Sequence, residues 1–286
     1  MKSIPTEEEL FERIDKVYFE LQELRGIPNS DYDQYYVSKT SSIERVLLEH
    51  PDNYNGKRII FLGDMDLSSL PISILSKPKD LAVLDIDKRI PEIVFNMKVK
   101  QKIRNIRYVN HDIRVRMIII LKNQFDYIFV EPPMTEEGLE VGLTRAVQCA
   151  NKESPSRIFL SFDIESEKED ILEELVNKMN LEIEEKKTDF NSYEYKTPLN
   201  KTVSDLYIIK VKQNSKETIA NHYYGPMYYR ESNSHLQLYK CKTICGESFN
   251  VGSEDEFNSI DELEKKGCPK CNHKGPFLYN SSIKME

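Results

Sequence analysis

A glutamate followed by two prolines, Glu131-Pro132-Pro133, ends an apolar run at 125–130. Proline fixes φ and cannot donate to a strand ladder, so Glu131 is held on stiff backbone. An amine with a pKa near about 10 must lose a proton before it attacks carbon, and a nearby carboxylate orients the amine and accepts or relays that proton. We therefore predict that Glu131 is catalytic and binds a nucleophilic amine. The alternative is a helix cap or surface acid before Thr135.

Two aspartates follow an earlier apolar run, in FLGDMDLSSL (61–70). With Gly63 as its single glycine, this loop does not have the G-x-G-x-x-G spacing of NAD and FAD sites, and the sequence has no Walker phosphate loop. Asp64 and Asp66 would repel the carboxylate of S-adenosylmethionine. Decarboxylated S-adenosylmethionine ends instead in an aminopropyl ammonium, which paired carboxylates bind well. The alternative for both aspartates is N-capping of a helical segment at 67–76.

Acids also follow the next two apolar runs. Asp85 is the first acid after its run, at a position where acids accept hydrogen bonds from ribose hydroxyls, and Asp87 is the alternate. Asp112, in VNHDI, is placed to bind the adenine amino group. Each acid alone is also a common helix cap. Taken in order along one sheet, they predict an adenosine site with decarboxylated S-adenosylmethionine as the co-substrate.

These acids require a sheet whose strand ends meet at one edge. Short apolar runs alternate with helical stretches, which predicts right-handed crossovers and a Rossmann-like, doubly wound, mostly parallel α/β sheet. After a helix around 166–179 come strands at 181–187 and 205–212, the second predicted as an antiparallel edge strand, as in nucleoside-sulfonium enzymes. The five apolar strands are predicted at 58–63, 81–85, 106–110, 126–130 and 157–162.

The chain begins with a predicted amphipathic helix. Thr6 and Glu9 form a capping-box pattern, and apolar residues recur at helical spacing from Leu10 to Leu24, before Gly26 ends the helix. We expect the apolar side to pack on its own chain; packing on a second subunit, in a homodimer, is the alternative. The predicted domains are a short N-terminal helical extension (1–55), a catalytic domain (56–212), a polar linker with an internal aromatic run (213–235) and a zinc ribbon (236–286).

Four of the five cysteines lie near the end of the sequence, as Cys241-x3-Cys245 and Cys268-Pro-x-Cys271. Two thiolate pairs satisfy tetrahedral zinc and leave no open position, which predicts a structural Zn²⁺ site. Such a ribbon would cover the active site, form a dimer contact or recognise a larger acceptor such as a peptide. Cys149, alone on a predicted helix, is expected to be buried filler.

Composition narrows the function classes. The net charge of −8 over 286 residues disfavours a duplex nucleic acid partner and favours cationic small molecules, although solubility alone also accounts for it. No apolar run approaches the roughly 20 residues of a membrane span, and the first residues do not have the layout of a signal peptide. We therefore expect a cytoplasmic protein without a membrane partner.

Several segments together resemble the branched-chain polyamine synthases, the bis(aminopropyl)spermidine synthase family, over roughly residues 31–212. The resemblance implies transfer of aminopropyl groups from decarboxylated S-adenosylmethionine to a polyamine nitrogen, with release of methylthioadenosine. It places Gly63, Asp64 and Asp66 in the donor loop and Glu131 on the catalytic acid. It also implies that Phe190, Asn191 and Tyr193 line the acceptor pocket, an ordinary aromatic loop being the alternative. The segments are GKRIIFLGDMDLSSL, VLDIDKR, HDI, FDYIFVEPPMTEEGLEVGLTRAV and DFNSYEY.

Two positions depart from the family pattern. Met65 replaces the middle aspartate of a G-D-D-D stretch, and Glu131 replaces the aspartate of D-P-P, which extends the carboxylate by about 1.5 Å. Met65 removes one charge from the donor clamp, and the longer Glu131 side chain indicates a different acceptor position or size. The leading hypothesis is an aminopropyltransferase acting on a cationic amine. The alternatives are a methyltransferase that uses S-adenosylmethionine and a non-catalytic binding protein. His111 and His222 are expected to be structural.

Overall fold

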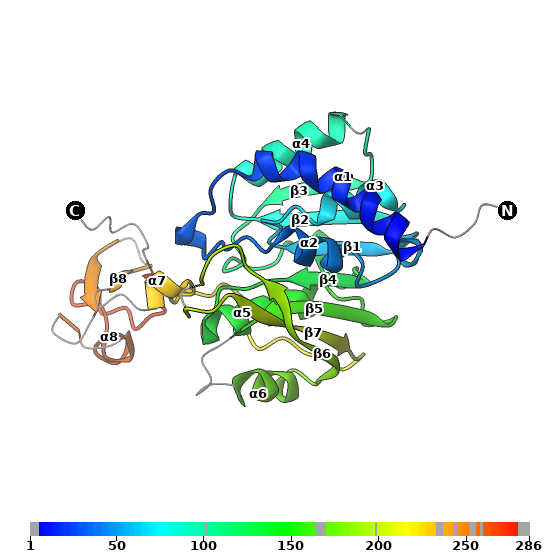
Figure 1. Cartoon of the computed structure of the whole chain (residues 1–286). Helices are drawn as coiled ribbons and strands as arrows, with labels where there is room; N and C mark the ends of the chain where they lie inside the picture. Colours follow the sequence, from blue (N-terminus) through cyan, green and yellow to red (C-terminus); the bar gives the residue numbers. More distant parts are fainter. Residues whose placement is uncertain are drawn as a thin grey trace.

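The central feature of the computed structural model is a seven-stranded sheet, in the order β3-β2-β1-β4-β5-β7-β6, with helices on both faces (Figure 1). This is the predicted Rossmann-like, doubly wound, mostly parallel α/β fold. The structure describes residues 6–100, 102–163, 170–197, 199–232, 237–242, 245–251, 256–257 and 260–279.

Five strands pair in parallel, and each begins and ends within one residue of its predicted bounds. Their buried, β-branched and aromatic composition is typical of strands covered on both faces. Their carboxyl ends meet at one edge of the sheet. These strands are β1 (Arg58–Leu62), β2 (Asp80–Asp85), β3 (Ile106–Asn110), β4 (Tyr127–Val130) and β5 (Ser156–Phe162).

The predicted edge strand is wrong in one respect. β7 (Val203–Val211) is antiparallel, but it lies between β5 and β6 (Leu181–Ser192), so β6 forms the edge. Leu206 and Ile209 of β7 are buried in the cores on opposite faces of the sheet, which suits an interior strand. The charged run at 184–187 of β6 is mostly exposed, and such charges protect an edge.

One face of the sheet is covered by α1 to α4 and the other by α5 and α6. α1 has the predicted capping box at Thr6 and ends at Gly26, and its Ile14, Tyr18 and Leu21 are buried within the chain. Leu24 is 46% exposed, contrary to the predicted apolar stripe, and Tyr18 is buried instead. The side chain of Leu10 lies outside the described set. The helices are α1 (Glu7–Arg25), η1 (Ser30–Tyr32), α2 (Lys39–Val46), η2 (Pro51–Tyr54), α3 (Ser69–Leu75), α4 (Arg89–Lys100), η3 (Ile119–Leu121), α5 (Glu136–Cys149) and α6 (Asp170–Lys178).

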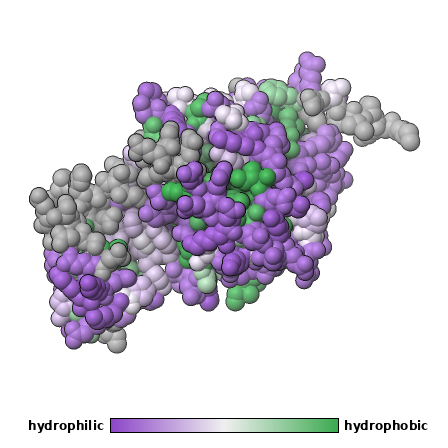
Figure 2. Space-filling model, turned by 90° about the horizontal axis from the view of Figure 1, so that it is seen from below, coloured by the Kyte–Doolittle hydropathy of each residue, from purple (hydrophilic) through white to green (hydrophobic). Residues whose placement is uncertain are grey.

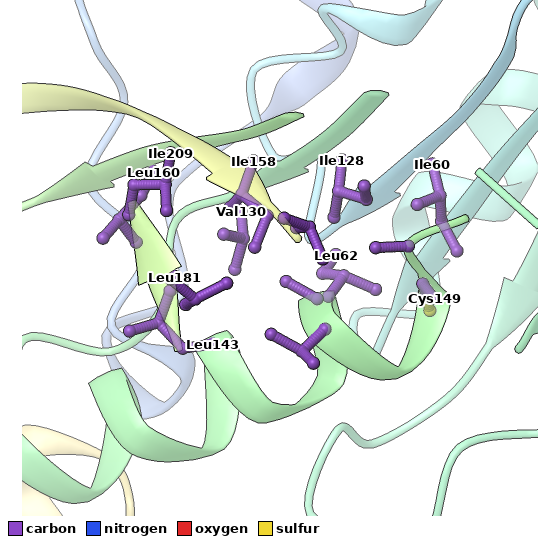
Figure 3. Close-up of a cluster of buried hydrophobic side chains, with 14 of the residues drawn as sticks. Ile60, Leu62, Ile128, Val130, Leu143, Cys149, Ile158, Leu160, Leu181 and Ile209 are labelled. Carbon is purple, nitrogen blue, oxygen red and sulfur yellow. The ribbon is translucent and has the colours of Figure 1, made fainter. Parts of the chain in front are cut away.

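The core between the sheet and α5 is continuous and apolar. Figure 3 shows Ile60, Leu62, Ile128 and Val130 of the parallel strands pointing towards α5. Cys149 lies in the same core, fully buried, as predicted. Of the helix predicted around 166–179, residues 166–169 lie outside the described residues, and α6 accounts for the described part. This core fixes the strand ends that carry the site.

A small second sheet, in the order β10-β8-β9, lies to one side of the main sheet (Figure 1). Tyr239, Phe249 and Phe277 are buried in its own cluster. Tyr279 N donates to Tyr224 O at 3.0 Å, which joins it to the aromatic run at 222–229. Its elements are β8 (Gln237–Lys240), β9 (Ser248–Val251), α8 (Ile260–Lys266) and β10 (Leu278–Tyr279), and α7 (Tyr229–Ser232) precedes them.

The face shown in Figure 2 is mostly hydrophilic, with a group of hydrophobic residues near its centre and smaller groups elsewhere. Among the described helices, none combines the length and apolar character that a bilayer crossing requires.

Candidate active site

A pocket lies at the carboxyl ends of the parallel strands, where the sequence predicted it. Gly63, Asp64 and Asp66 follow β1, Asp85 ends β2 and Glu131 follows β4, and all five line the pocket. Its outer wall comes from two segments remote in sequence, 32–34 and 227–228. The pocket therefore brings together five of the predicted site residues.

Gly63 and two acids form the side of the pocket next to β2. Gly63 has a φ of +84°, a conformation that favours glycine. Asp64 accepts hydrogen bonds from the amide (3.3 Å) and hydroxyl of Ser69, while its own amide donates to Asp85 at 3.0 Å. Asp64 thus binds the start of α3, the alternative weighed from the sequence, although the N-cap position itself is Ser68.

Burial is the largest influence on the pKa values of Asp64 and Asp85. It raises the pKa of Asp64 well above its ordinary value, although the Ser69 hydrogen bonds oppose the shift. It raises the pKa of Asp85 to about 6, against the hydrogen bonds from the Asp64 and Asp87 amides. Among the described residues, the hydrogen-bond partners of these two carboxylates are backbone amides and the Ser69 hydroxyl, and none is an arginine. A cationic ligand at this side of the pocket would favour their ionised forms.

Asp66 points to a different environment from Asp64, two residues away. Its carboxylate accepts from Arg25 at 2.9 Å and from Arg45 at 3.1 Å. The amide of Val37 lies 3.3 Å from the same group. Burial raises the pKa of Asp66 to about 7, and the two guanidinium groups counteract it. Asp66 therefore already has two cationic partners.

Glu131 is held from both sides. Arg45 Nη1 donates to Glu131 Oε2 at 2.7 Å, and the Tyr193 hydroxyl donates to Glu131 Oε1 at 2.8 Å. Each carboxylate oxygen has two lone pairs, so both can accept a further bond from a ligand amine. Burial alone would lower the pKa of Arg45, but Glu131 and Asp66 raise it above its ordinary value.

The two prolines after Glu131 pack against α5. A Cβ at Gly138 would lie 2.4 Å from the Pro133 carbonyl oxygen, and one at Gly142 would lie 2.8 Å from Pro132 Cβ. Only glycine permits this close approach. Thr135 caps α5 by accepting from the Gly138 amide, so Glu131 is not the cap of this helix.

Two further predicted residues, Asp87 and Asp112, lie near the pocket but do not line it. Asp112 is bound by Arg114 at 2.9 Å and is not a lining residue, whereas its neighbours His111 and Ile113 are. Burial lowers the pKa of His111, and its Nε2 is buried without a partner among the described residues. Asp87 is bound by Arg89 at 2.6 Å.

The three residues predicted to line the acceptor pocket contribute through their contacts. Tyr193 binds Glu131, and Asn191 accepts from Arg45 Nε at 2.7 Å. Both are buried, at 5% and 0% exposure. Phe190 packs against the core on the face covered by α1 to α4, and none of the three residues lines the pocket itself.

Sequence reasoning missed the arginines and the outer wall. Arg45 is buried on α2 together with Ile43 and Val46, so a cation on the apolar face of a helix was the available signal. Met227 and Tyr228 were predicted in a linker, and they are buried against Val141. The aromatic run at 222–229 was the signal for that wall.

The four terminal cysteines come together. Their sulfur atoms lie within 4.8 Å of one another, with 3.4 Å between Cys245 and Cys271 and 3.6 Å between Cys241 and Cys271. Four sulfurs on a tetrahedral zinc ion, at bonds of about 2.3 Å, would be about 3.8 Å apart. The residues present therefore fit such an ion.

The family described as "branched-chain polyamine synthase A C-terminal domain" matches residues 13–257. An uncharacterized protein of Methanocaldococcus jannaschii is 28% identical over 245 residues, 84% of this chain and 59% of that protein. The N(4)-bis(aminopropyl)spermidine synthase of the same organism is 26% identical over 196 residues, 67% of this chain and 55% of that protein. The chain thus spans a little over half the length of these relatives.

A solved structure has the same fold. It is the branched-chain polyamine synthase of Thermus thermophilus in complex with N4-aminopropylspermidine and 5'-methylthioadenosine, with a TM-score of 0.68 and 20% sequence identity. The match covers 76% of this chain and 69% of that one.

Proposed function

The chain belongs to the family of the branched-chain polyamine synthase A C-terminal domain, and from this premise we propose that it is an aminopropyltransferase. The donor is decarboxylated S-adenosylmethionine, and the acceptor is an amine. The observation that carries the proposal is Glu131, which lines the pocket after β4 and is held by Arg45 and Tyr193.

The reaction needs little besides positioning. The unprotonated nitrogen of the acceptor attacks the donor carbon next to the sulfonium, and a C–N bond forms. The C–S bond breaks with its electron pair on sulfur, which leaves neutral methylthioadenosine. Glu131 orients the nitrogen and accepts or relays its proton, the usual part of a carboxylate in such a step.

We assign the donor to the side of the pocket next to β2. Asp85 would bind the ribose hydroxyls, and Asp64 would bind the aminopropyl ammonium. Asp66, predicted as the partner of Asp64, is bound by Arg25 and Arg45, so we assign it to holding these arginines. The adenine would lie near Ile113 and the unpartnered Nε2 of His111 rather than on Asp112.

A product assay tests the proposal. The purified chain is incubated with a panel of amines and either decarboxylated or intact S-adenosylmethionine, in parallel reactions, and the products are identified by mass spectrometry. We expect amines enlarged by one aminopropyl unit together with methylthioadenosine. If the chain instead forms methylated amines from intact S-adenosylmethionine and no aminopropyl products, it is a methyltransferase and the proposal is wrong.

We further propose that the four cysteines bind one structural Zn²⁺. Zinc would stabilise the small sheet, whose own apolar cluster is small. The test is metal content by mass spectrometry of the intact protein. We expect one zinc per chain, lost in Cys268→Ser and retained in Cys149→Ala, the matched control. Equal zinc in both variants would contradict the assignment.

A further inference from the structure

Arg45 has one donor group without a partner. Its Nη1 binds Glu131 and Asp66, and its Nε binds Asn191. Its Nη2 is buried and has no hydrogen-bond partner among the described residues. Arg45 itself is 8% exposed and lines the pocket. A buried donor on a charged group is costly to leave unpaired, so this nitrogen indicates a ligand oxygen.

Arg45 approaches Glu131 from the side of the pocket that faces β6, opposite β2. Asp85 on β2 lies on one side of β4, and the pocket continues on the other side to Phe159 of β5 and Leu206 of β7. Arg45 spans from Glu131 to Asn191, which belongs to β6 at the far edge. Its side chain thus enters the pocket from the side opposite the proposed donor side, and the tip of the guanidinium reaches Glu131 and Asp66.

The acceptor side offers little to a ligand that carries only ammonium groups. Of the acids lining the pocket, Asp66 and Glu131 are both bound by Arg45. Phe129 lies stacked between Phe61 and Phe159, with ring centroids 4.5 and 4.7 Å apart. Both faces of Phe129 are therefore covered, and ring faces are what attract cations. Apolar rings next to a guanidinium suit an apolar chain with an anionic end.

We propose that the acceptor is an amine that also carries a carboxylate, which binds Arg45 on the acceptor side of the pocket. This inference rests on the proposed function and names its substrate class. The amine nitrogen reaches Glu131, while the carboxylate receives Arg45 Nη2. Guanidinium and carboxylate form strong, directional hydrogen bonds. Arg45 then determines specificity, and Glu131 positions the nucleophile.

Matched acceptors test the inference. Ornithine is 1,4-diaminobutane with one added carboxylate, and lysine bears the same relation to 1,5-diaminopentane. We measure kcat/KM for each amine with decarboxylated S-adenosylmethionine. For at least one pair we expect the carboxylated member to be favoured by about tenfold or more, the effect of one hydrogen bond between charged groups. In Arg45→Gln the ratio should fall to about one.

Two further variants guard against a loss of folding. Arg45→Lys keeps the charge but loses the second terminal nitrogen, and we expect an intermediate ratio. Arg25→Gln also removes a guanidinium from Asp66, but Arg25 does not line the pocket, so the ratio should stay at the wild-type value. If the kcat/KM ratio falls as much in Arg25→Gln as in Arg45→Gln, the assignment of Arg45 is overturned.

Binding separates this inference from the proposed function. With methylthioadenosine present, calorimetry compares the same amine pairs without requiring turnover. Preferred binding of the carboxylated amine, lost in Arg45→Gln, supports the inference even if no aminopropyl product forms. Aminopropyl transfer to the plain diamines with equal or higher kcat/KM overturns the inference and leaves the proposed function standing. An Arg45-dependent preference for intact over decarboxylated S-adenosylmethionine would place the carboxylate on the donor, and also overturns it.

Discussion

The acids on the two sides of the pocket have different hydrogen-bond partners. Asp64 and Asp85, next to β2, are bound by backbone amides and a serine hydroxyl. Asp66, in the loop after β1, and Glu131, after β4, are bound by arginines, and Glu131 is also bound by a tyrosine. The first pair is the one that we propose binds the cationic donor, whereas the second pair binds Arg45. An acid-rich loop therefore does not by itself define a cation site, because the partners of each acid decide its role.

The largest effect should come from Glu131. If it orients the amine and takes its proton, Glu131→Gln should lower kcat by about 10²- to 10⁴-fold, the usual contribution of such a group. Steady-state kinetics with the best acceptor measures this. Glu137→Gln, in the first turn of α5, is the matched control and should keep kcat. A kcat reduced less than threefold in Glu131→Gln would remove Glu131 from the mechanism.

Stability should distinguish Asp66 from Asp64. At pH 8, above its pKa of about 7, Asp66 is ionised and balances Arg25 and Arg45. Asp66→Asn leaves both arginines without that charge and should lower the free energy of unfolding by about 3 kcal/mol or more. Asp64→Asn should cost about 1 kcal/mol, because it weakens hydrogen bonds to Ser69 alone. Urea denaturation measures both, and equal losses would erase the proposed difference.

The donor side should respond to pH. The pKa of Asp85 is raised to about 6, so its negative charge is present above that pH and is lost below it. Affinity for the cationic donor should therefore weaken by about tenfold as the pH falls from 7.5 to 5, since one pKa unit corresponds to about 1.4 kcal/mol. Calorimetry across this range should show an inflection near 6 that is absent in Asp85→Asn. If the inflection near pH 6 persists in Asp85→Asn, another group causes it.

A smaller effect is expected at Tyr193. Tyr193→Phe removes one hydrogen bond to Glu131 but leaves Arg45 in place, so kcat should fall by about fivefold, the effect of one ordinary hydrogen bond. Tyr195→Phe, on an exposed ring nearby, is the control. A loss as large as that of Glu131→Gln would mean that Tyr193 itself handles the proton.

The sequence predicted what local pattern determines. Alternating apolar runs gave the parallel strands to within one residue, and Pro132-Pro133 marked where β4 ends. The order of β6 and β7 was wrong because both segments alternate, and the pairing of strands depends on contacts distant in sequence. Arg25 and Arg45 were missed for a similar reason: they meet Asp66 from helices 41 and 21 residues away in sequence. The aromatic wall at Tyr228 likewise reaches the pocket only in the folded chain.

Donor discrimination tests the central claim most directly. Calorimetry on the wild-type chain compares S-adenosylmethionine with its decarboxylated form, which differ only at the group facing Asp64. The account predicts tighter binding of the decarboxylated donor, by about tenfold or more for one charge-assisted contact, and a loss of this preference in Asp64→Asn. Tighter binding of intact S-adenosylmethionine by the wild-type chain would contradict aminopropyl transfer.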